Sequence, residues 1–353
     1  MGSRCAQSYD SRVSDRTDST VQAAQNRNEE AFAVLAEPLR AELLVHCYRM
    51  LGSLHEAEDV VQETLMRAWR AFRRFEPRAS FRAWLYKIAT NACLDVIRNR
   101  PRRTFPVSAS PAANPLEPTG KPADEFRWLE PFPDLVLPHT PDNPEARVAR
   151  REGMSLAFIV ALQWLPGRQR AVLILRDVLD FRTSEVAELL TMTIPAVNSA
   201  LHRARATMAK QHVTNGVLAP LSDPQLLRVV NEFVDAMEAG DLPRVLATLT
   251  TNAKWIMPPL SAWYEGRHAI AMFIASRVFA ARERGIARRR IVARANGQPA
   301  LAVYHQASTR RVYEAFALQV LTIDVSVWQI SEVTTFLNAD LFPAFGLPLE
   351  IPM

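Results

Sequence analysis

The distribution of proline constrains this 353-residue chain more than any other feature of its sequence. Eleven of the 24 prolines fall between Pro101 and Pro144. Because proline fixes φ and lacks the N–H donor that helices and sheets require, such a density excludes regular helix and sheet. We therefore expect residues 101–145 to form an extended, semi-stiff linker between folded parts of the chain.

Chain length and composition indicate a multidomain globular protein with a mildly basic balance of charge. One hydrophobic core rarely grows past about 250 to 300 residues, so we expect two or three domains. The hydrophobic fraction of 48% is ordinary, and a formal charge of +5 with a pI near 9.4 leans basic. This balance permits a nucleic-acid or acidic protein partner without requiring one.

The cysteines and the lack of long apolar runs bear on the cellular compartment of the protein. Cys5, Cys47 and Cys93 show no Cys-x-x-Cys pair and no matching His spacing, so we expect no disulfide framework, metal site or cofactor. No stretch approaches the roughly 18 apolar residues of a membrane span, and the polar start lacks the core of a signal peptide. We expect a soluble, cytoplasmic protein with no membrane partner, whose residues 1–26 form a disordered lead-in.

Residues 27–100 show the three- and four-residue spacing of amphipathic helices. A first apolar series ends near Gly52, which suits a left-handed helix cap, and Ser53 can cap the next helix. A third helix begins after Ser80 and ends before Pro101. The pattern predicts a small all-helical bundle.

The second of these helices is acidic at its N-terminal end and basic at its C-terminal end. Charges in this order complement the helix dipole, which is a complete structural explanation. A sharper hypothesis is that the acidic end docks on another protein. Both interpretations are open for its polar residues Glu58, Asp59, Gln62 and Glu63.

The third helix and the loop before it combine aromatic, basic and small hydroxyl side chains. This mixture is suited to holding unstacked bases against aromatic faces and their phosphates against cationic groups. The alternative is an ordinary solvated basic surface, with Thr90 among the residues facing outward. Trp84 also lies close to the apolar stripe and fits the core equally well. The candidate residues for single-strand binding are Arg78, Ser80, Phe81, Trp84, Lys87 and Asn91.

Residues 146–212 become helical again and contain two short helices joined by a tight turn. The first covers Thr183–Leu190, and the second begins at Ile194 with proline in its first turn, as in helix-turn-helix motifs. In such motifs the second helix lies in the major groove with its N-terminal side chains at base edges. The candidate residues for duplex recognition are Ala196, Asn198, Ser199, His202, Arg203 and Arg205.

Residues 222–353 predict an α+β domain, with amphipathic helices first and a meander of strands after them. Runs that are apolar or alternate in polarity are typical of strands, and they occur at 291–295, 301–305, 315–320 and 325–333. Such a domain can enclose a pocket, whose candidate lining residues are Trp255, Met257, Trp263, Tyr264, His268 and Asp324. Because no acid–base pair with diagnostic spacing is present, we expect no catalytic residues and no enzyme activity.

Three parts of the chain resemble known families. Residues Glu58–Trp69 and Phe81–Asn91 closely resemble the sigma-2 domain of bacterial extracytoplasmic-function (ECF) sigma factors of the sigma-70 family. The helix-turn-helix and the segment Leu165–Val172 resemble the sigma-4 domain of that family. The turn Tyr264–Ile270 resembles SnoaL-like domains of the NTF2 superfamily, which form an α+β cone.

The resemblance implies a dissociable subunit of bacterial RNA polymerase with a regulatory C-terminal domain. The acidic residues of the second helix would bind the β′ clamp, and the third helix would open and hold the promoter −10 element. The helix-turn-helix would read the −35 element. The implied partners are core RNA polymerase, through its β′ clamp and β flap, and promoter DNA. An anti-sigma factor or a small ligand of the C-terminal domain is an open question.

Alternatives remain open at this point. A one-component helix-turn-helix regulator with a ligand-sensing domain would not need the 27–100 bundle, and a SnoaL-like enzyme fused to a DNA-binding module would show turnover. Many ECF factors carry Lys and Arg where this chain has Asn198 and Ala200, which implies a weaker grip on phosphates. The aromatic linker segment Phe126–Asp134 either threads the polymerase cleft, as the equivalent linker does in sigma factors, or folds back on its own chain.

Overall fold

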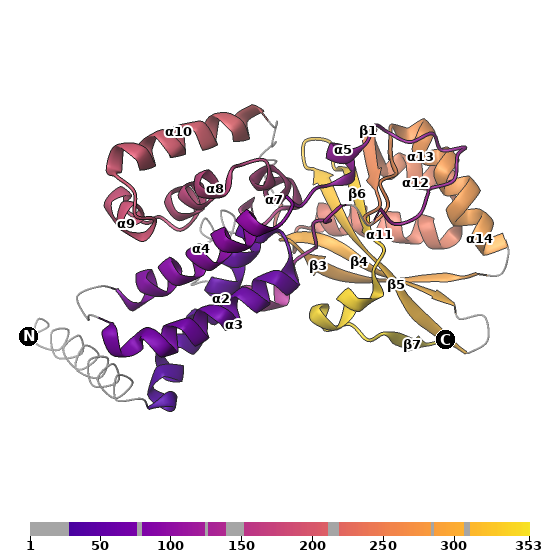
Figure 1. Ribbon diagram of the computed structural model, residues 1–353. Helices are drawn as coiled ribbons and strands as arrows, with labels where there is room; N and C mark the ends of the chain where they lie inside the picture. The colour runs from indigo at the N-terminus through magenta and orange to yellow at the C-terminus, as the bar shows by residue number, and fades with distance from the viewer. Residues whose placement is uncertain are drawn as a thin grey trace, which may run out of the picture. The chain divides into compact units, whose positions relative to one another are not determined.

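The computed structural model of the chain divides into two compact units (Figure 1). The first unit contains residues 1–100 and 165–207, and the second contains residues 101–164 and 208–353. The expected disordered lead-in, residues 1–26, lies outside the part of the chain that the structure describes. The described residues are 28–75, 80–123, 126–138, 152–210, 219–283, 286–306 and 311–353.

The N-terminal part of the first unit is the predicted helical bundle, and its helices begin and end at recognisable caps. Helix α2 (Glu29–Leu51) ends at Gly52 in the left-handed conformation, with φ of 71°. The hydroxyl of Ser53 caps α3 (Leu54–Ala71), which continues into a 3-10 turn η1 (Phe72–Arg74). Ser80 caps α4 (Phe81–Asn99) in the same way. The three helices pack pairwise against one another.

The remainder of the first unit contains the predicted helix-turn-helix. It comprises α8 (Gly167–Leu173), a π-helical turn η3 (Ile174–Val178), α9 (Thr183–Leu189) and α10 (Ile194–Lys210). Buried Arg170 ties α8 to the bundle, because its guanidinium donates to the carbonyls of Met50 and Leu165. Gly167 is also in close contact with α4: a Cβ there would lie 3.1 Å from Leu94 Cδ2.

Helix α4 is buried on more than the one face that its apolar spacing predicts. Thr90, expected to face outward, is only 1% exposed, and its hydroxyl lies 2.9 Å from Nε2 of His46 on α2. Thr90 is buried where α4 meets His46 of α2, and α4 also packs against α3, α8 and α9. A helix with neighbours on several sides buries polar positions that a single-stripe pattern assigns to solvent.

The second unit begins with the proline-rich segment, whose described residues form only short helices. These are α5 (Pro106–Ala109) and the 3-10 turn η2 (Asp134–Val136), followed by α7 (Leu156–Gln163) after the proline-rich segment. The expectation of no helix between 101 and 145 is therefore corrected at two short turns, α5 and η2. In α5, proline occupies the first helical position and needs no N–H partner.

The C-terminal part of the second unit is an α+β domain, as predicted. Helices α11 (Pro224–Ala239) and α12 (Leu242–Thr248) precede the sheet, and α13 (Arg267–Phe273), the π-helical turn η4 (Ile274–Phe279) and α14 (Ala280–Glu283) follow its second strand. The strands are β1 (Leu249–Ile256), β2 (Trp263–Glu265), β3 (Arg288–Ala295), β4 (Gln298–Gln306), β5 (Val312–Asp324), β6 (Gln329–Phe336) and β7 (Glu350–Pro352).

The sheet is mixed, with strand order β2-β1-β6-β5-β4-β3 and β7 paired to β5. Strands β1 and β6 are parallel, and the other pairs are antiparallel. The run predicted at 325–333 starts too early, since residues 325–328 form the turn before β6. A 3-10 helix η5 (Ala339–Phe345) precedes β7.

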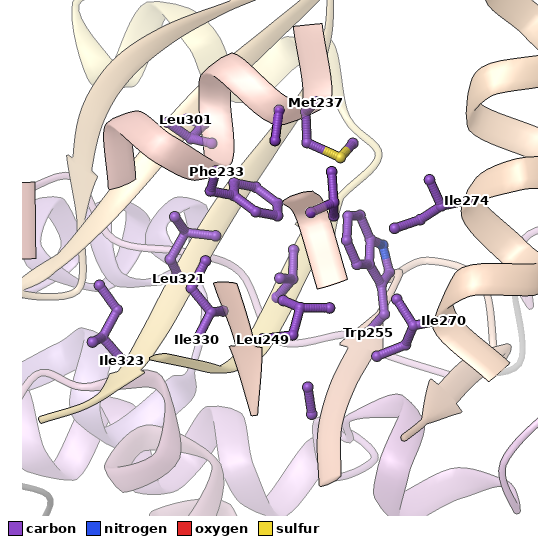
Figure 2. Packing of buried hydrophobic residues seen from close by; sticks show 14 of the residues in the cluster. Phe233, Met237, Leu249, Trp255, Ile270, Ile274, Leu301, Leu321, Ile323 and Ile330 are labelled. Atoms are coloured by element: carbon purple, nitrogen blue, oxygen red, sulfur yellow. The ribbon is translucent and has the colours of Figure 1, made fainter. Parts of the chain in front are cut away.

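One hydrophobic cluster joins the helices to the sheet in this domain (Figure 2). Phe233 and Met237 of α11 lie over the sheet, and Trp255 of β1 points in beside Ile270 and Ile274. The packing is close on the aromatic side as well, because the rings of Tyr264 and Phe273 stack with centroids 4.7 Å apart. Full burial of large aromatic side chains makes this the main stabilising core of the domain.

Candidate nucleic-acid and polymerase interfaces

The acidic end of α3 presents an open polar surface. Glu58, Asp59 and Gln62 are exposed, while the opposite face of the helix, which includes Val60 and Val61, is buried in the bundle. Glu63 differs from its neighbours, because its carboxylate accepts a 2.6 Å hydrogen bond from Arg67. The row therefore offers three side chains with no hydrogen-bonding or ionic partner among the described residues.

An aromatic cluster lies where α3 gives way to α4. The rings of Phe72 and Phe75 stack, with centroids 5.4 Å apart and planes 10° apart. Trp84 packs 5.1 Å from Phe75, and Phe81 lies 5.7 Å from Phe72. Phe81 and Trp84 are both half-buried, so each has an edge toward solvent as well as a role in packing. Two of the predicted base-binding rings thus share one cluster.

The remaining residues predicted to bind single-stranded DNA lie in different settings. Ser80 and Asn91 are exposed and Lys87 is half-buried, all on α4 or its cap. Arg78 lies outside the described residues. Arg82, which was not among the candidates, pairs with Glu42 at 3.0 Å, and its guanidinium lies 4.8 Å from the ring centre of Tyr86 and 5.2 Å from that of Phe181.

A buried histidine supports α4 from behind. His46 is fully buried on α2, and its Nδ1 has no hydrogen-bond partner within the described part of the chain. Burial, reinforced by the nearby charges of Arg49 and Arg82, lowers the pKa of His46 to about 3. The ring is therefore neutral at physiological pH, and its hydrogen bond to Thr90 holds α2 and α4 together.

The second helix of the helix-turn-helix presents the polar row that its sequence predicts. Asn198, Ser199, His202 and Arg203 are exposed, whereas Val197 and Leu201 are buried and Ala196 is half-buried. The turn before the helix includes Thr191 at a positive φ of 52°, and the Thr193 hydroxyl caps the helix by accepting from the Ala196 N–H.

Arg205, the last residue of this predicted row, is already engaged. Its guanidinium forms two hydrogen bonds with the carboxylate of Asp177, at 2.8 and 2.7 Å. These hydrogen bonds and the negative charge of Asp177 raise the pKa of Arg205. Contact with DNA through Arg205 would have to compete with a two-point ion pair that orients its side chain.

The proline-rich segment folds back on the C-terminal domain within the second unit. Ser110 donates to the carbonyl of Ser261 at 2.6 Å and accepts through its own carbonyl from the indole of Trp263 at 2.9 Å. Ala113 adds a backbone hydrogen bond to the carbonyl of Trp263 at 2.8 Å. Residues 110–113 of the linker thus pack on the chain's own C-terminal domain.

Asn296 is the centre of the second group of linker contacts. Its side-chain oxygen accepts from Phe132 N–H at 2.8 Å, and its amide donates to the carbonyl of Met154 at 2.9 Å. Its backbone N–H donates to the carbonyl of Phe132, also at 2.8 Å. Because Phe132 and Asn296 are fully buried, these hydrogen bonds fasten the aromatic part of the linker to the β3–β4 turn.

The six residues predicted to line a C-terminal pocket lie in separate environments. Trp255, Met257 and Tyr264 belong to the hydrophobic core, whereas Trp263 turns its indole toward the linker. His268 is exposed on α13. Asp324 lies at the β5–β6 turn, where hydrogen bonds from Ser326 lower its pKa.

Two further observations concern metal binding and membrane-spanning helices. No group of three or more His, Cys, Asp or Glu side chains converges there in a way that could hold a metal ion. None of the helices in the described ranges is both long enough and apolar enough to cross a membrane.

Two family models match separate stretches of this chain. A family model for Sigma-70 region 2 matches residues 35–103, and one for Sigma-70, region 4 matches residues 155–208. The ECF RNA polymerase sigma factor SigG of Mycobacterium tuberculosis is 43% identical over 322 residues, which cover 90% of this chain and 84% of that protein.

One solved structure shares its fold with most of this chain. The ECF sigma factor SigJ of Mycobacterium tuberculosis superposes with a TM-score of 0.56 at 22% identity, covering 90% of this chain and 99% of that one. A SnoaL-like protein of unknown function from Burkholderia thailandensis matches 34% of this chain and 98% of its own, at 15% identity and a TM-score of 0.26.

Proposed function

This chain belongs to the ECF RNA polymerase sigma factors, and from that premise we propose which of its surfaces carries each step of promoter recognition. Sigma factors bind core RNA polymerase and promoter DNA, and the family is not enzymatic. The observation that carries the proposal is the stretch from α3 to α4, where an exposed acidic row and an aromatic cluster follow one another along the chain.

The acidic row of α3 docks on the β′ clamp of core polymerase in this proposal. Glu58, Asp59 and Gln62 support it because they are exposed, and a docking partner would not have to displace an existing contact. Glu63 contributes less, since Arg67 already pairs with it. A surface of this kind gains specificity and association rate from its charge more than raw affinity.

The aromatic cluster and the polar residues beside it hold the opened −10 strand. Phe81 and Trp84 supply ring faces for bases, and Ser80, Lys87 and Asn91 supply polar contacts. On α10, Asn198, His202 and Arg203 read the −35 duplex, because each is exposed along a helix of the helix-turn-helix. Arg205 orients the motif through Asp177 and gives at most a secondary DNA contact.

The C-terminal domain regulates initiation in cis by holding the linker. The hydrogen bonds that Ser110 and Phe132 donate to this domain support the proposal, since a linker held there is not free to enter the polymerase. Release of the linker is then a step that precedes full activity. This role concerns residues 101–164 and 219–353, which belong to one compact unit.

The docking assignment is tested with the double variant Asp59→Ala and Gln62→Ala. We expect weaker binding of core polymerase, with unchanged binding of a −35 duplex, because α10 is untouched. The matched control is Glu29→Ala with Glu30→Ala, which removes two exposed acidic residues from α2. Equal core affinity for the wild type and the Asp59 and Gln62 variant would refute the assignment.

The regulatory assignment is tested by run-off transcription with the variant Asn296→Gly. Glycine keeps the left-handed backbone at this position, where φ is 56°, and removes the side-chain hydrogen bonds to Phe132 and Met154. We expect more initiation together with faster hydrogen exchange in residues 126–138. The control Asn252→Ser changes an exposed asparagine of β1. Faster exchange with unaltered transcription would remove the regulatory role.

A further inference from the structure

Two polar side chains in the sheet of the C-terminal domain are buried without full hydrogen bonding. Arg290 of β3 is 8% exposed, and its Nε has no hydrogen-bond partner within the described part of the chain. Gln319 of β5 is 4% exposed, and its side-chain oxygen likewise lacks a partner among those residues. Buried polar atoms without partners are rare in folded proteins, so each of them needs an explanation.

Strand register places the two side chains on one face of the sheet. Arg290 pairs with Val303 of β4, and Val303 pairs with Ala317 of β5, two residues before Gln319. Because paired residues share a face, as do alternate residues along a strand, Arg290 and Gln319 point to the same side. Leu301 is paired with Gln319 and belongs to the core cluster, so this is the side that the helices cover (Figure 2).

Arg290 carries its positive charge into this interior. Glu238 of α11 lies nearby, and its carboxylate accepts from the backbone N–H of Arg290 at 2.9 Å. Burial, together with repulsion from Arg288, lowers the pKa of Arg290 to about 10, although the charge of Glu238 opposes this shift. The guanidinium is therefore charged at neutral pH, and its burial with an unpartnered donor is a cost to the fold.

A purely structural role is the alternative explanation for Arg290. Among the described residues, Arg170 and Arg176 also have a buried, unpartnered Nε, and each donates through a terminal nitrogen to a backbone carbonyl. Arg288 of the same strand donates to the carbonyl of Val278 at 2.9 Å. No such hydrogen bond from the Arg290 side chain is found within the described ranges, so packing alone does not explain its position.

The surroundings of the two polar groups define a complementary ligand. A guanidinium fork matches a carboxylate in charge and geometry. Gln319 now donates to the Thr335 hydroxyl at 3.1 Å, and an amide turned end for end would accept from that hydroxyl and donate to a ligand. Val303 and Ala317, which lie between them in the register, are small and apolar. The matching ligand is a carboxylate attached to an apolar group.

We propose that Arg290 and Gln319 bind the carboxylate of a small apolar acid inside the C-terminal domain. Arg290 supplies the charge and a two-point hydrogen bond, Gln319 supplies a further donor, and the apolar part lies against the sheet. This site differs from the pocket expected from the sequence, whose lining residues lie in separate environments. The proposal does not rest on the promoter contacts or on the regulatory role of the domain, and ligand binding alone decides it.

The test measures binding of octanoate to the full chain by equilibrium dialysis, with 1-octanol as the uncharged comparator. We expect octanoate to bind at least about 10-fold more tightly, since only the carboxylate forms charge-assisted hydrogen bonds with Arg290. Arg290→Met should abolish this preference, and Gln319→Met should weaken octanoate binding by about 5-fold. Hydrogen exchange should become slower in residues 288–306 and 312–324 when octanoate is bound.

A matched control and a second readout separate binding from packing. Arg289→Met removes the same charge from the exposed neighbour on β3, and we expect it to leave octanoate binding unchanged. Removal of a buried charge that lacks a full set of partners is neutral or stabilising. Without ligand, Arg290→Met should therefore unfold at the same temperature as the wild type or at a higher one.

Every other outcome counts against the site. Equal affinity for octanoate and 1-octanol overturns the proposal, as does an unchanged preference in Arg290→Met, which would show binding by the apolar core alone. Slower exchange confined to other parts of the chain would place the ligand elsewhere and also overturns it. A marked fall in the unfolding temperature of Arg290→Met would show that Arg290 supports the fold instead.

A second variant keeps the proposal testable if Arg290→Met does not fold. Arg290→Lys keeps the charge and loses the two-point geometry, so octanoate affinity should fall by about 5-fold. Unchanged octanoate affinity in Arg290→Lys would overturn the assignment of the guanidinium group.

Discussion

Lowering the pH is expected to destabilise the first unit through one buried side chain, His46. Its folded pKa of about 3 lies below the value of about 6.5 that it has in an unfolded chain. Between these values the unfolded chain binds a proton that the folded chain does not bind. The contribution of His46 is therefore complete above about pH 6.5 and is lost progressively as the pH falls.

The magnitude follows from the separation of the two pKa values. From about pH 7.5 to about pH 5 the unfolded histidine becomes almost fully protonated while the folded one stays neutral, which removes about 2 kcal/mol from the free energy of unfolding. The structure supplies the cause. The ring is fully buried, and its Nδ1 has no acceptor among the described residues. Arg49 and Arg82 would also repel the positive charge of a protonated ring.

The assay compares the wild type with His46→Gln, which keeps a polar group near Thr90 and does not titrate. Urea unfolding is followed by hydrogen exchange in peptides from α2 and α4, so that the readout belongs to this unit. We expect the wild type to lose about 2 kcal/mol more than the variant over the same pH range. Equal losses would refute the reasoning, as would an NMR titration of the His46 ring in the folded protein with a midpoint near 6.5.

Two further substitutions test contacts described above. Asn296→Ala should destabilise the second unit by about 2 to 4 kcal/mol, since it leaves buried partners at Phe132 and Met154 unsatisfied and since alanine tolerates the left-handed conformation less well than asparagine. Thermal unfolding should show Asn296→Gly to be milder by about 1 kcal/mol, because glycine adopts this conformation freely. Gly167→Val should cost about 1 to 3 kcal/mol in urea unfolding, because even its Cβ would lie 3.1 Å from Leu94 and 3.2 Å from Ile97. An equally stable valine variant would show that α4 and α8 separate easily.

The helices of the first unit could be predicted because their caps and apolar spacing are local in sequence. Gly52, Ser53 and Ser80 occupy the cap positions that their residue types favour. The burial of Thr90 could not be predicted in this way, since its partner His46 lies on α2, 44 residues earlier in the chain. Spacing along one helix shows which face is most apolar and not how many neighbours the helix has.

For the linker, the sequence predicted the local conformation but not the surface on which it packs. Proline density correctly excludes long helices, and it contains no information about the surface on which the segment packs. One local signal was available: Asn296-Gly297 is a typical two-residue hairpin turn, and both residues have positive φ, 56° and 68°. The same signal marks the residue that binds Phe132, but only the fold reveals that its side chain points to the linker.

The candidate DNA-binding surface was also predictable only where it depends on local helical spacing. Exposure of Asn198, His202 and Arg203 follows from helical spacing around buried Val197 and Leu201. The pairing of Arg205 with Asp177 does not, because it joins two helices whose relative position only packing determines. The packing of Trp84 against Phe72, Phe75 and Phe81 likewise needed coordinates, since its spacing fits both the core and the surface.

Each unit is formed by two separate stretches of the chain, which affects how truncated proteins should be interpreted. The second unit takes residues 101–164 from the middle of the chain and joins them to residues 208–353. A truncation before residue 222 would thus discard the larger part of a folded body and leave residues 101–164 without it, uncovering Phe132 and Leu156, which are at most 1% exposed in the intact protein. The behaviour of such a shortened chain would reflect the newly exposed hydrophobic surface of residues 101–164 as much as the loss of the C-terminal domain. Point substitutions at Asn296 separate the two effects.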